Sequence, residues 1–319
     1  MQLWACGFNA WGQLQFADNK HAECLNSDGT TQQPTLNDLP KDLEKFECVL
    51  VDPNIEVLKT SHSATIIRQS SQLVQTGSPD HFFQYLKSED CQVPNEHIAQ
   101  TLSEKVAAFK SDTLSTYESL DKYKSGIPII IDSTAVEDVK NVIANDTSFY
   151  ALTKSGKVLS WGDVRHQNSL GREVNEDSPA DVPCVIEDLA SDPITGIKKI
   201  SAGGYIAGAL TNENDLYVWG GRQGQETPLP DMSGIPDSVD IEGEDILDFG
   251  VGDRHIVVLT MSHRLWVIGN NSNGQCGDGS NNEIGAWKEV ILPLDKGQKI
   301  VKVYGGYKTS FAIVDGEAE

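Results

Sequence analysis

A phrase of short β-strands recurs along this chain. Residues 200–220 read as a small-residue strand, a tight turn, an apolar strand ending in Ala-Leu-Thr, a polar turn, and a third strand ending in Trp-Gly. The same phrase returns in residues 249–269 and in residues 142–162. Because one such β-meander cannot bury its faces alone, neighbouring copies must cover each other. The chain is therefore predicted to be a β-repeat protein.

Three further copies of the phrase are divergent. They occupy residues 57–77, 106–117 and 300–314, and the last of them stops before a third strand. Residues 2–7, Gln-Leu-Trp-Ala-Cys-Gly, match the strand that is missing there. An N-terminal strand that completes a unit begun by the C-terminus closes a ring of sheets and removes its open edges. We therefore predict a closed propeller whose last blade is completed by the N-terminal strand.

The repeat resembles that of a known family. The order Ala-Gly-Gly, Ala-Leu-Thr, Leu-Tyr-Val-Trp-Gly and then Gly-Gln resembles the repeat of the regulator of chromosome condensation (RCC) family of β-propellers. The resemblance implies an all-β fold, which we expect to form a single domain over residues 1–319. Six copies are counted, but the founding members have seven blades. A seventh blade would have to lie within residues 19–51 or 77–104, and we expect six.

Apolar spacing adds two expectations about local structure. Three-to-four spacing of apolar residues predicts a helix over residues 96–108, as a decoration on the β body. The tryptophans at the ends of third strands, such as Trp161 and Trp219, are expected to pack between blades.

The charge of the chain limits its partners. It carries 25 basic and 47 acidic residues, a net charge of −22. Because this field repels phosphates, direct binding to nucleic acid or to a membrane surface is not expected. No secretory signal and no apolar run of membrane-spanning length occur, so we expect an intracellular protein of the cytoplasm, the nucleus or both. Acidic clusters at residues 173–177 and 240–245 are either solvated loops or a docking surface for a basic partner.

Sequence motifs for catalysis are missing. There is no Walker-type phosphate loop, no Gly-x-Ser-x-Gly elbow and no His-Glu-x-x-His pair. The six cysteines show no Cys-x-x-Cys spacing, which predicts free thiols and neither a disulfide framework nor a zinc site. The sequence therefore predicts no enzyme, no metal site and no cofactor.

The turn between the first and second strands of each copy suggests a recognition face. In a closed ring the equivalent turns project on one face, where binding residues concentrate on loops. Asp and Gly could also stand there only as turn formers. Trp11 and Trp287 lie in loop-like sequence and are candidate exposed anchors, unless they are half buried. The candidate partner-binding residues are His62, Asp112, Asp146, Tyr205, Asp253, Arg254 and Tyr307 in these turns, together with Trp11 and Trp287.

These observations favour a non-catalytic protein-interaction scaffold or adaptor that is monomeric by itself. The chain resembles short family members that pair with a JmjC-type oxygenase or, in the alpha-tubulin-suppressor type, with a small zinc protein. That resemblance implies a regulatory subunit of a chromatin- or tRNA/translation-modifying enzyme, whose partner presents a basic surface or tail. The alternative is a guanine-nucleotide exchange factor for a small GTPase, the activity of the founding family member. No segment of the sequence resembles that member's β-wedge.

Overall fold

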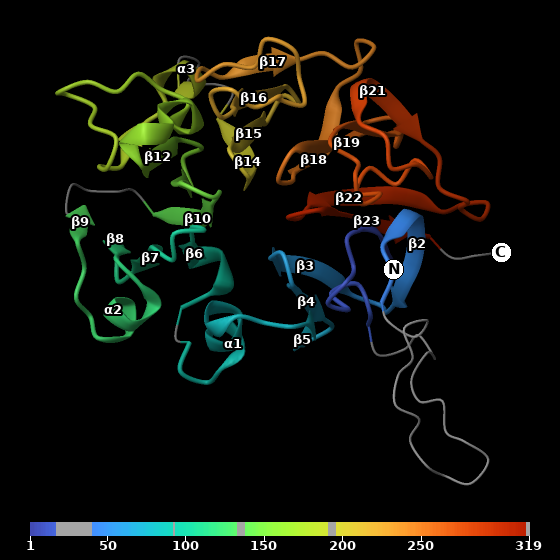
Figure 1. Ribbon diagram of the computed structural model, residues 1–319, viewed down its shortest axis with the longest axis horizontal. Helices are drawn as coiled ribbons and strands as arrows, with labels where there is room; N and C mark the ends of the chain where they lie inside the picture. Colours follow the sequence, from blue (N-terminus) through green and yellow to red (C-terminus); the bar gives the residue numbers. More distant parts are fainter. Residues whose placement is uncertain (17–39, 92, 133–137, 191–195, 317–319) are drawn as a thin grey trace, which may run out of the picture.

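The chain folds into a ring of β-sheets around a central cavity (Figure 1). The computed structural model describes residues 1–16, 40–91, 93–132, 138–190 and 196–316. Within these residues the strands form six separate antiparallel sheets, the blades of a propeller. The first strand of each blade lies toward the centre and the last toward the outside. The predicted six-bladed, all-β propeller is confirmed.

The strands are assigned to blades in chain order. Blade 1 contains β3 (Ile55–Thr60), β4 (Ala64–Gln69) and β5 (Gln72–Gly77). Blade 2 contains β6 (Ile98–Gln100), β7 (Val106–Lys110), β8 (Thr113–Tyr117) and β9 (Ile130–Asp132). Blade 3 contains β10 (Val139–Ala144), β11 (Ser148–Thr153), β12 (Val158–Gly162) and β13 (Cys184–Val185). Blade 4 contains β14 (Ile197–Gly203), β15 (Ile206–Thr211), β16 (Leu216–Gly220) and β17 (Asp237–Val239). Blade 5 contains β18 (Ile246–Val251), β19 (His255–Thr260), β20 (Leu265–Gly269) and β21 (Ile284–Val290). Blade 6 contains β22 (Lys299–Gly305), β23 (Thr309–Asp315), β1 (Gln2–Gly7) and β2 (Leu43–Val51). The short helices are α1 (His81–Lys87), α2 (Leu120–Lys124), α3 (Glu187–Ala190), η1 (Asn95–His97) and η2 (Val164–Leu170).

The two ends of the chain meet in blade 6. Strand β1 pairs antiparallel with β23, in a register that runs from Gln2 opposite Val314 to Gly7 opposite Thr309. On its other side β1 pairs with β2. Leu3 of β1 is fully buried in a cluster with Phe311 of β23. The predicted closure by the N-terminal strand is confirmed, and the N-terminal part of the chain supplies the outer strand as well.

Apolar side chains fill the spaces between blades. Trp161 of blade 3 stacks on Phe149 and donates from Nε1 to Oγ1 of Thr116 in blade 2, at 2.9 Å. Trp219 of blade 4 donates in the same way to the Ser169 carbonyl oxygen of blade 3, at 3.1 Å. Both tryptophans are buried. The predicted packing of these two side chains between blades is confirmed, and it fixes blade 3 against blade 2 and blade 4 against blade 3.

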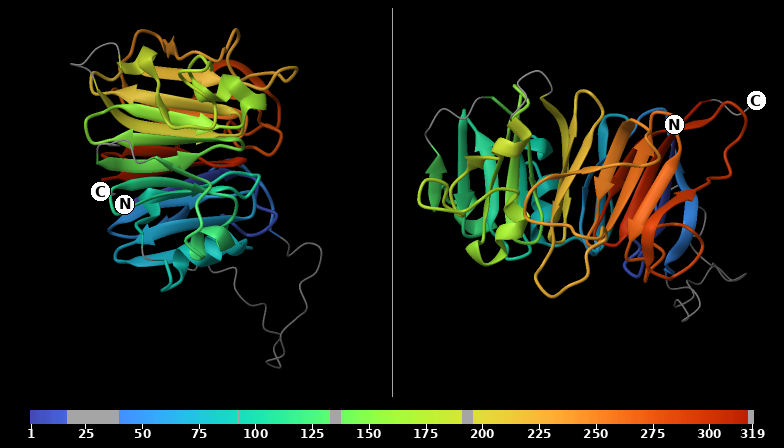
Figure 2. Two further views of the ribbon diagram at one scale, coloured as in Figure 1. Left: turned by 90° about the vertical axis from the view of Figure 1, so that its left-hand side faces the viewer. Right: turned by 90° about the horizontal axis from the view of Figure 1, so that it is seen from above.

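The strands cross the thickness of the ring, so their connections gather on two opposite faces (Figure 2). We name the mouth face as the one that carries the turns between first and second strands, at residues 61–63, 101–105, 145–147, 204–205, 252–254 and 306–308. The far face carries the turns between second and third strands. Loops after the third strands return to the mouth face, because antiparallel neighbours alternate in direction.

One local prediction, the helix over residues 96–108, is wrong. Residues 96–108 form no helix beyond η1, because Ile98, Leu102 and Val106 belong to a strand, a turn and a second strand. The apolar residues there belong to two strands that are buried on both sides, rather than to one helical face. No seventh blade lies in residues 77–104, which form α1, η1 and β6. Within residues 19–51, β2 belongs to blade 6, and residues 19–39 lie outside the described part.

Candidate functional site

The turns on the mouth face share one backbone geometry. In blade 5 the N–H of Gly252 donates to the carbonyl of His255 at 2.8 Å, and in blade 3 the N–H of Asn145 donates to that of Ser148 at 2.9 Å. Blades 1, 2 and 6 close their turns with equivalent bonds. In each blade, the residue that follows the N–H donor of this turn-closing bond therefore occupies the same place. We call these residues the mouth ring, and they are His62, Leu102, Asp146, Gly204, Asp253 and Tyr307.

Backbone hydrogen bonds join the mouth ring from blade to blade. The N–H of Leu102 donates to the Asp146 carbonyl at 3.1 Å, Asp146 to Gly204 at 2.9 Å, and Asp253 to Tyr307 at 3.0 Å. Gly204 has a φ of +53°, and a Cβ there would lie 2.0 Å from the Asp253 carbonyl oxygen. Only glycine fits at that position. The main chain thus fixes the ring, which leaves its side chains available for contacts.

Loops that follow third strands also hold the mouth-face turns. The side-chain amide of Gln13 donates to the His62 carbonyl at 3.2 Å, across blades 6 and 1. Ser169 donates from its hydroxyl to the Tyr205 carbonyl at 3.2 Å, across blades 3 and 4. Each loop therefore braces the turn of the next blade, and the exposed positions rest on a rigid scaffold.

The predicted position of Asp112 is wrong. Asp112 lies in the turn between β7 and β8, the second and third strands of blade 2, and so on the far face. There it lines a depression of about 480 Å³ that also contains Lys154 of blade 3. The mouth-face turn of blade 2 is residues 101–105, in which Leu102 takes the equivalent position with 68% of its surface exposed.

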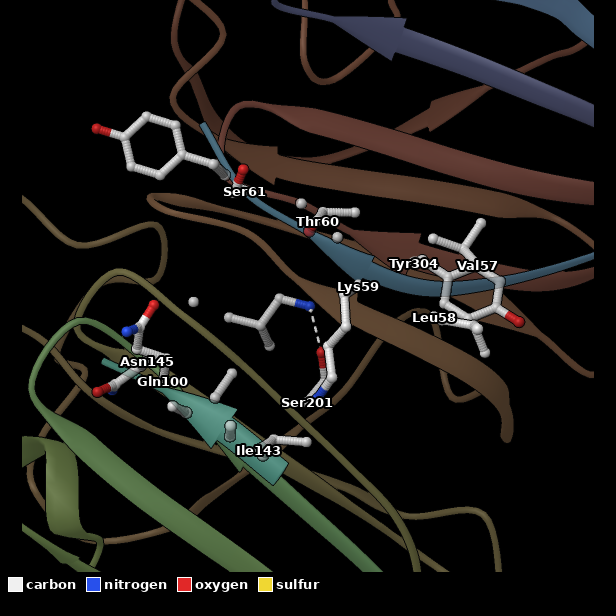
Figure 3. Close-up of a pocket in the computed structure, with 18 of the residues that line it drawn as sticks. Val57, Leu58, Lys59, Thr60, Ser61, Gln100, Ile143, Asn145, Ser201 and Tyr304 are labelled. Carbon is white, nitrogen blue, oxygen red and sulfur yellow. Dashed lines mark hydrogen bonds between the residues drawn. The ribbon is translucent and has the colours of Figure 1, made fainter. Parts of the chain in front are cut away.

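The mouth-ring residues other than Asp253 line a cavity of about 440 Å³. Figure 3 shows Lys59 and Thr60 of β3 on one side of it and Gln100 and Ile143 on the other. Burial lowers the pKa of the Lys59 ammonium to about 8, an effect that Glu96 opposes. Deeper in the wall, Lys199 of β14 pairs with Asp248 of β18 at 2.6 Å. The first strands thus present both polar and apolar side chains to the cavity.

Comparison with known proteins assigns the fold. No family model matches the chain. It is 27% identical over 197 residues to the mitochondrial RCC1 domain-containing protein RUG3 of Arabidopsis thaliana, over 60% of this chain and 43% of that protein. It is 28% identical over 147 residues to the human regulator of chromosome condensation, and the match covers 44% of this chain and 33% of the human protein. The Saccharomyces cerevisiae Prp20p structure covers the whole chain and 92% of Prp20p, with a TM-score of 0.65 and 12% identity. The chain is an RCC1-like repeat β-propeller.

Other relatives set the limits of this assignment. Human WBSCR16 superimposes over 98% of this chain and 82% of its own, with a TM-score of 0.55 and 15% identity. At such identities the structural likeness concerns the fold. Among the curated relatives, the matched part of this RCC1-like propeller spans less than half of the protein it matches.

Two carboxylates at the mouth of the propeller are costly to ionise. Burial and, as the smaller cause, the nearby Asp253 carboxylate together raise the pKa of Asp146 to about 7. Burial also raises the pKa of Asp253, against the opposing effect of Arg254 and Lys308. Neither carboxylate forms an ion pair with another described residue. The pair is therefore arranged so that an arriving cation would favour the ionised form of both.

Aromatic side chains stand beside the carboxylates on the mouth face. Tyr307 meets His62 edge-on, with ring centroids 6.1 Å apart. Tyr205 contacts the His166 ring at 5.1 Å and lies under the exposed Arg222 guanidinium at 5.3 Å. Trp11, in the loop after β1, exposes 54% of its surface. Exposed aromatic and arginine side chains on a rigid base have the composition of interface hot spots.

Of the remaining predicted residues, Arg254 lies where it was expected and Trp287 does not. Arg254 is exposed on the mouth face beside Asp253, as expected. Trp287 does not lie in a loop: it is a half-buried residue of the outer strand β21 and packs on the core between blades 4 and 5. Gly285 gave that strand a loop-like sequence, and Trp287 is not an exposed anchor. Leu102 was missed, because the hairpin of residues 106–117 was taken for the first two strands of blade 2, and the true first turn precedes it.

The described residues contain neither a metal-binding cluster nor a membrane-spanning helix. Among them, no three His, Cys, Asp or Glu side chains are grouped closely enough to hold a metal ion. Within the same residues, every helix is too short or too polar to cross a bilayer.

Proposed function

We propose that this RCC1-like propeller is a non-catalytic adaptor that holds a protein partner on its mouth face. In this proposal a basic side chain of the partner lies between Asp146 and Asp253, and the exposed ring of Trp11 and the half-buried ring of Tyr205 contact its apolar surface. The observation that carries the proposal is the pair of unpaired carboxylates with raised pKa values at the mouth ring.

Electrostatics supports a basic partner. A partly buried carboxylate loses hydration when it ionises, and a cation within about 4–6 Å favours its charged form. A basic side chain that donates to the carboxylate directly adds charge-assisted hydrogen bonds. The net charge of −22 also attracts a basic segment over longer distances. The acidic cluster at residues 173–177 lies in the mouth-face loop between β12 and β13, which adds to the attraction.

Relatives support a protein rather than a small molecule as the ligand. The Prp20p structure is described together with its binding to Gsp1p and histones, and another structure contains Prp20 bound to Kap60. For this chain, a JmjC-type oxygenase and a small zinc protein are the partner classes we propose, with the propeller as a regulatory subunit. Exchange-factor activity on a small GTPase is the second candidate, and the fold likeness to Prp20p is the observation that favours it.

The test is affinity purification with variants of both faces. Wild type, the double variant D146N/D253N and the far-face control D112N are tagged in their native cells, and the proteins that co-purify at moderate salt are quantified by mass spectrometry. We expect one stoichiometric partner that wild type and D112N retain and the folded double variant loses at least about tenfold, which is about 1.4 kcal/mol. Equal recovery by all three proteins would contradict the mouth-face site. A small GTPase that leaves when nucleotide is added would support the second candidate.

A further inference from the structure

The outer edge of blade 1 differs from that of every other blade. Within the described residues, blades 2 to 6 each have a fourth, outer strand, whereas blade 1 ends with its third strand, β5. In Figure 1, β5 lies on the outside of the ring. Among the residues that the structure describes, β5 is therefore the one third strand of a blade that has no strand beside its outward edge.

The backbone of β5 presents unused hydrogen-bonding groups along this edge. Gln72 pairs with Gln69 across a two-residue turn, and the Ser78 N–H donates to the Ser63 carbonyl beyond the other end of the strand. In this antiparallel register, alternate residues bond to β4, so Leu73 and Gln75 direct their N–H and C=O groups outward. No described residue bonds to these groups. The side-chain oxygen of Gln75 is also buried without a donor among the described residues.

The segment that follows β5 does not pair with it. Helix α1 begins at the N-cap Asp80, whose side chain accepts a hydrogen bond from the Phe83 N–H. The buried residues Phe82 and Leu86 of α1 join the apolar cluster between blades 1 and 2. The helix therefore fills the space between two blades, and the position of a fourth strand stays open in the described part of the chain.

Strand β5 also lacks the usual protection of an edge. Exposed edges are normally kept from pairing by charges, prolines or short length. The outer strand β2 carries Glu44, Lys45 and Glu47, and β21 carries Lys288 and Glu289. In contrast, β5 has the sequence Gln-Leu-Val-Gln-Thr-Gly, without charge or proline.

We propose that the β5 edge is a docking site for an extended segment of a partner protein, which adds antiparallel to β5 as the fourth strand of blade 1. The other five blades show how such a strand sits. Val74 faces the core toward blade 6 and Leu73 the core toward blade 2, so side chains of the added segment alternate between these two sides. The partner segment that this edge accepts is uncharged, free of proline and apolar at alternate positions. This site is separate from the mouth face and does not depend on the proposed function.

The test uses a phage-displayed library of random short peptides and the full-length propeller. Binders are selected on wild type and remade as synthetic peptides, and their affinity is measured by fluorescence anisotropy. The variant Gln75→Pro removes one outward N–H without removing a bond to β4, and Gln75→Thr is its matched control. We expect peptides of alternating pattern whose affinity falls at least about tenfold with Gln75→Pro and stays unchanged with Gln75→Thr.

A second measurement leaves the propeller unchanged. N-methylation of the peptide backbone, one position at a time, should weaken binding at every second residue, because alternate N–H groups face β5. Uniform effects along the peptide, or a library without binders sensitive to Gln75→Pro, would overturn the proposal. If light scattering showed a wild-type dimer that Gln75→Pro dissolves, the occupant would be a second copy of the chain, and the partner segment would be excluded.

Discussion

Replacing Asp146 with asparagine should stabilise the propeller, and only above acidic pH. The carboxyl of Asp146 has a pKa of about 7 in the folded protein, compared with an ordinary value of 3.8. Between these values the folded chain binds the proton more tightly than the unfolded chain. The free energy of unfolding of wild type therefore falls as the pH rises from about 4 to about 7, and stays lowered above that range.

The size of the effect follows from the same shift. At 1.36 kcal/mol for each pKa unit, the difference sets an upper limit of about 4 kcal/mol. Because the Asp146 side chain is only partly buried, solvent screens the penalty, and we expect roughly 1–2 kcal/mol. Asparagine keeps the shape of the side chain and removes the charge. D146N should thus gain roughly 1–2 kcal/mol over wild type at pH 8 and almost nothing at pH 4.

Urea denaturation from pH 4 to pH 8 measures this difference directly. The control is D112N, in an exposed far-face turn, which should change the free energy of unfolding by no more than about 0.5 kcal/mol at any pH. The single variant D253N should shift the wild-type pH dependence toward lower pH, because the Asp253 carboxylate contributes to the raised pKa of Asp146. A gain for D146N that is the same at pH 4 and pH 8 would refute the argument.

Two further predictions concern the scaffold. Leu3→Ala should cost roughly 2–5 kcal/mol in the free energy of unfolding, because Leu3 is fully buried in the strand that closes the ring; a loss below about 1 kcal/mol would contradict that role. Gly204→Ala should lower the melting temperature far more than Gly224→Ala. Both residues have a positive φ, but only a Cβ at Gly204 would collide with the Asp253 carbonyl, and equal losses would show that the mouth ring can relax.

The repeat was predictable where strand and turn signals agree along the chain. Blades 3, 4 and 5 each keep a third strand that ends in Trp-Gly or Ile-Gly, and their strands lie where the phrase places them. The N-terminal closure followed from the missing strand of the last copy. In blade 2, by contrast, residues 106–117 form a hairpin. Its sequence is compatible both with the first and second strands of the blade and with the second and third. Packing of β6 against β10 of blade 3 makes β6 the first strand of blade 2. Because this contact is tertiary, the local sequence does not encode it.

The candidate site was predictable to the same extent. Asp146, Tyr205 and Tyr307 lie on one face because their turns follow well-marked first strands. Asp112 was misplaced by the hairpin of blade 2, and the exposed Leu102 was missed for the same reason. The raised pKa of Asp146 depends on burial and on a carboxylate two blades away, which no local pattern encodes.

Hydrogen–deuterium exchange on the purified complex with the recovered partner tests the central claim most directly. A partner on the mouth face should slow exchange in the turns at residues 61–63, 145–147 and 306–308 and leave the far-face turn at Asp112 unchanged. Slowed exchange confined to the far face, with unchanged mouth-face turns, would contradict the account.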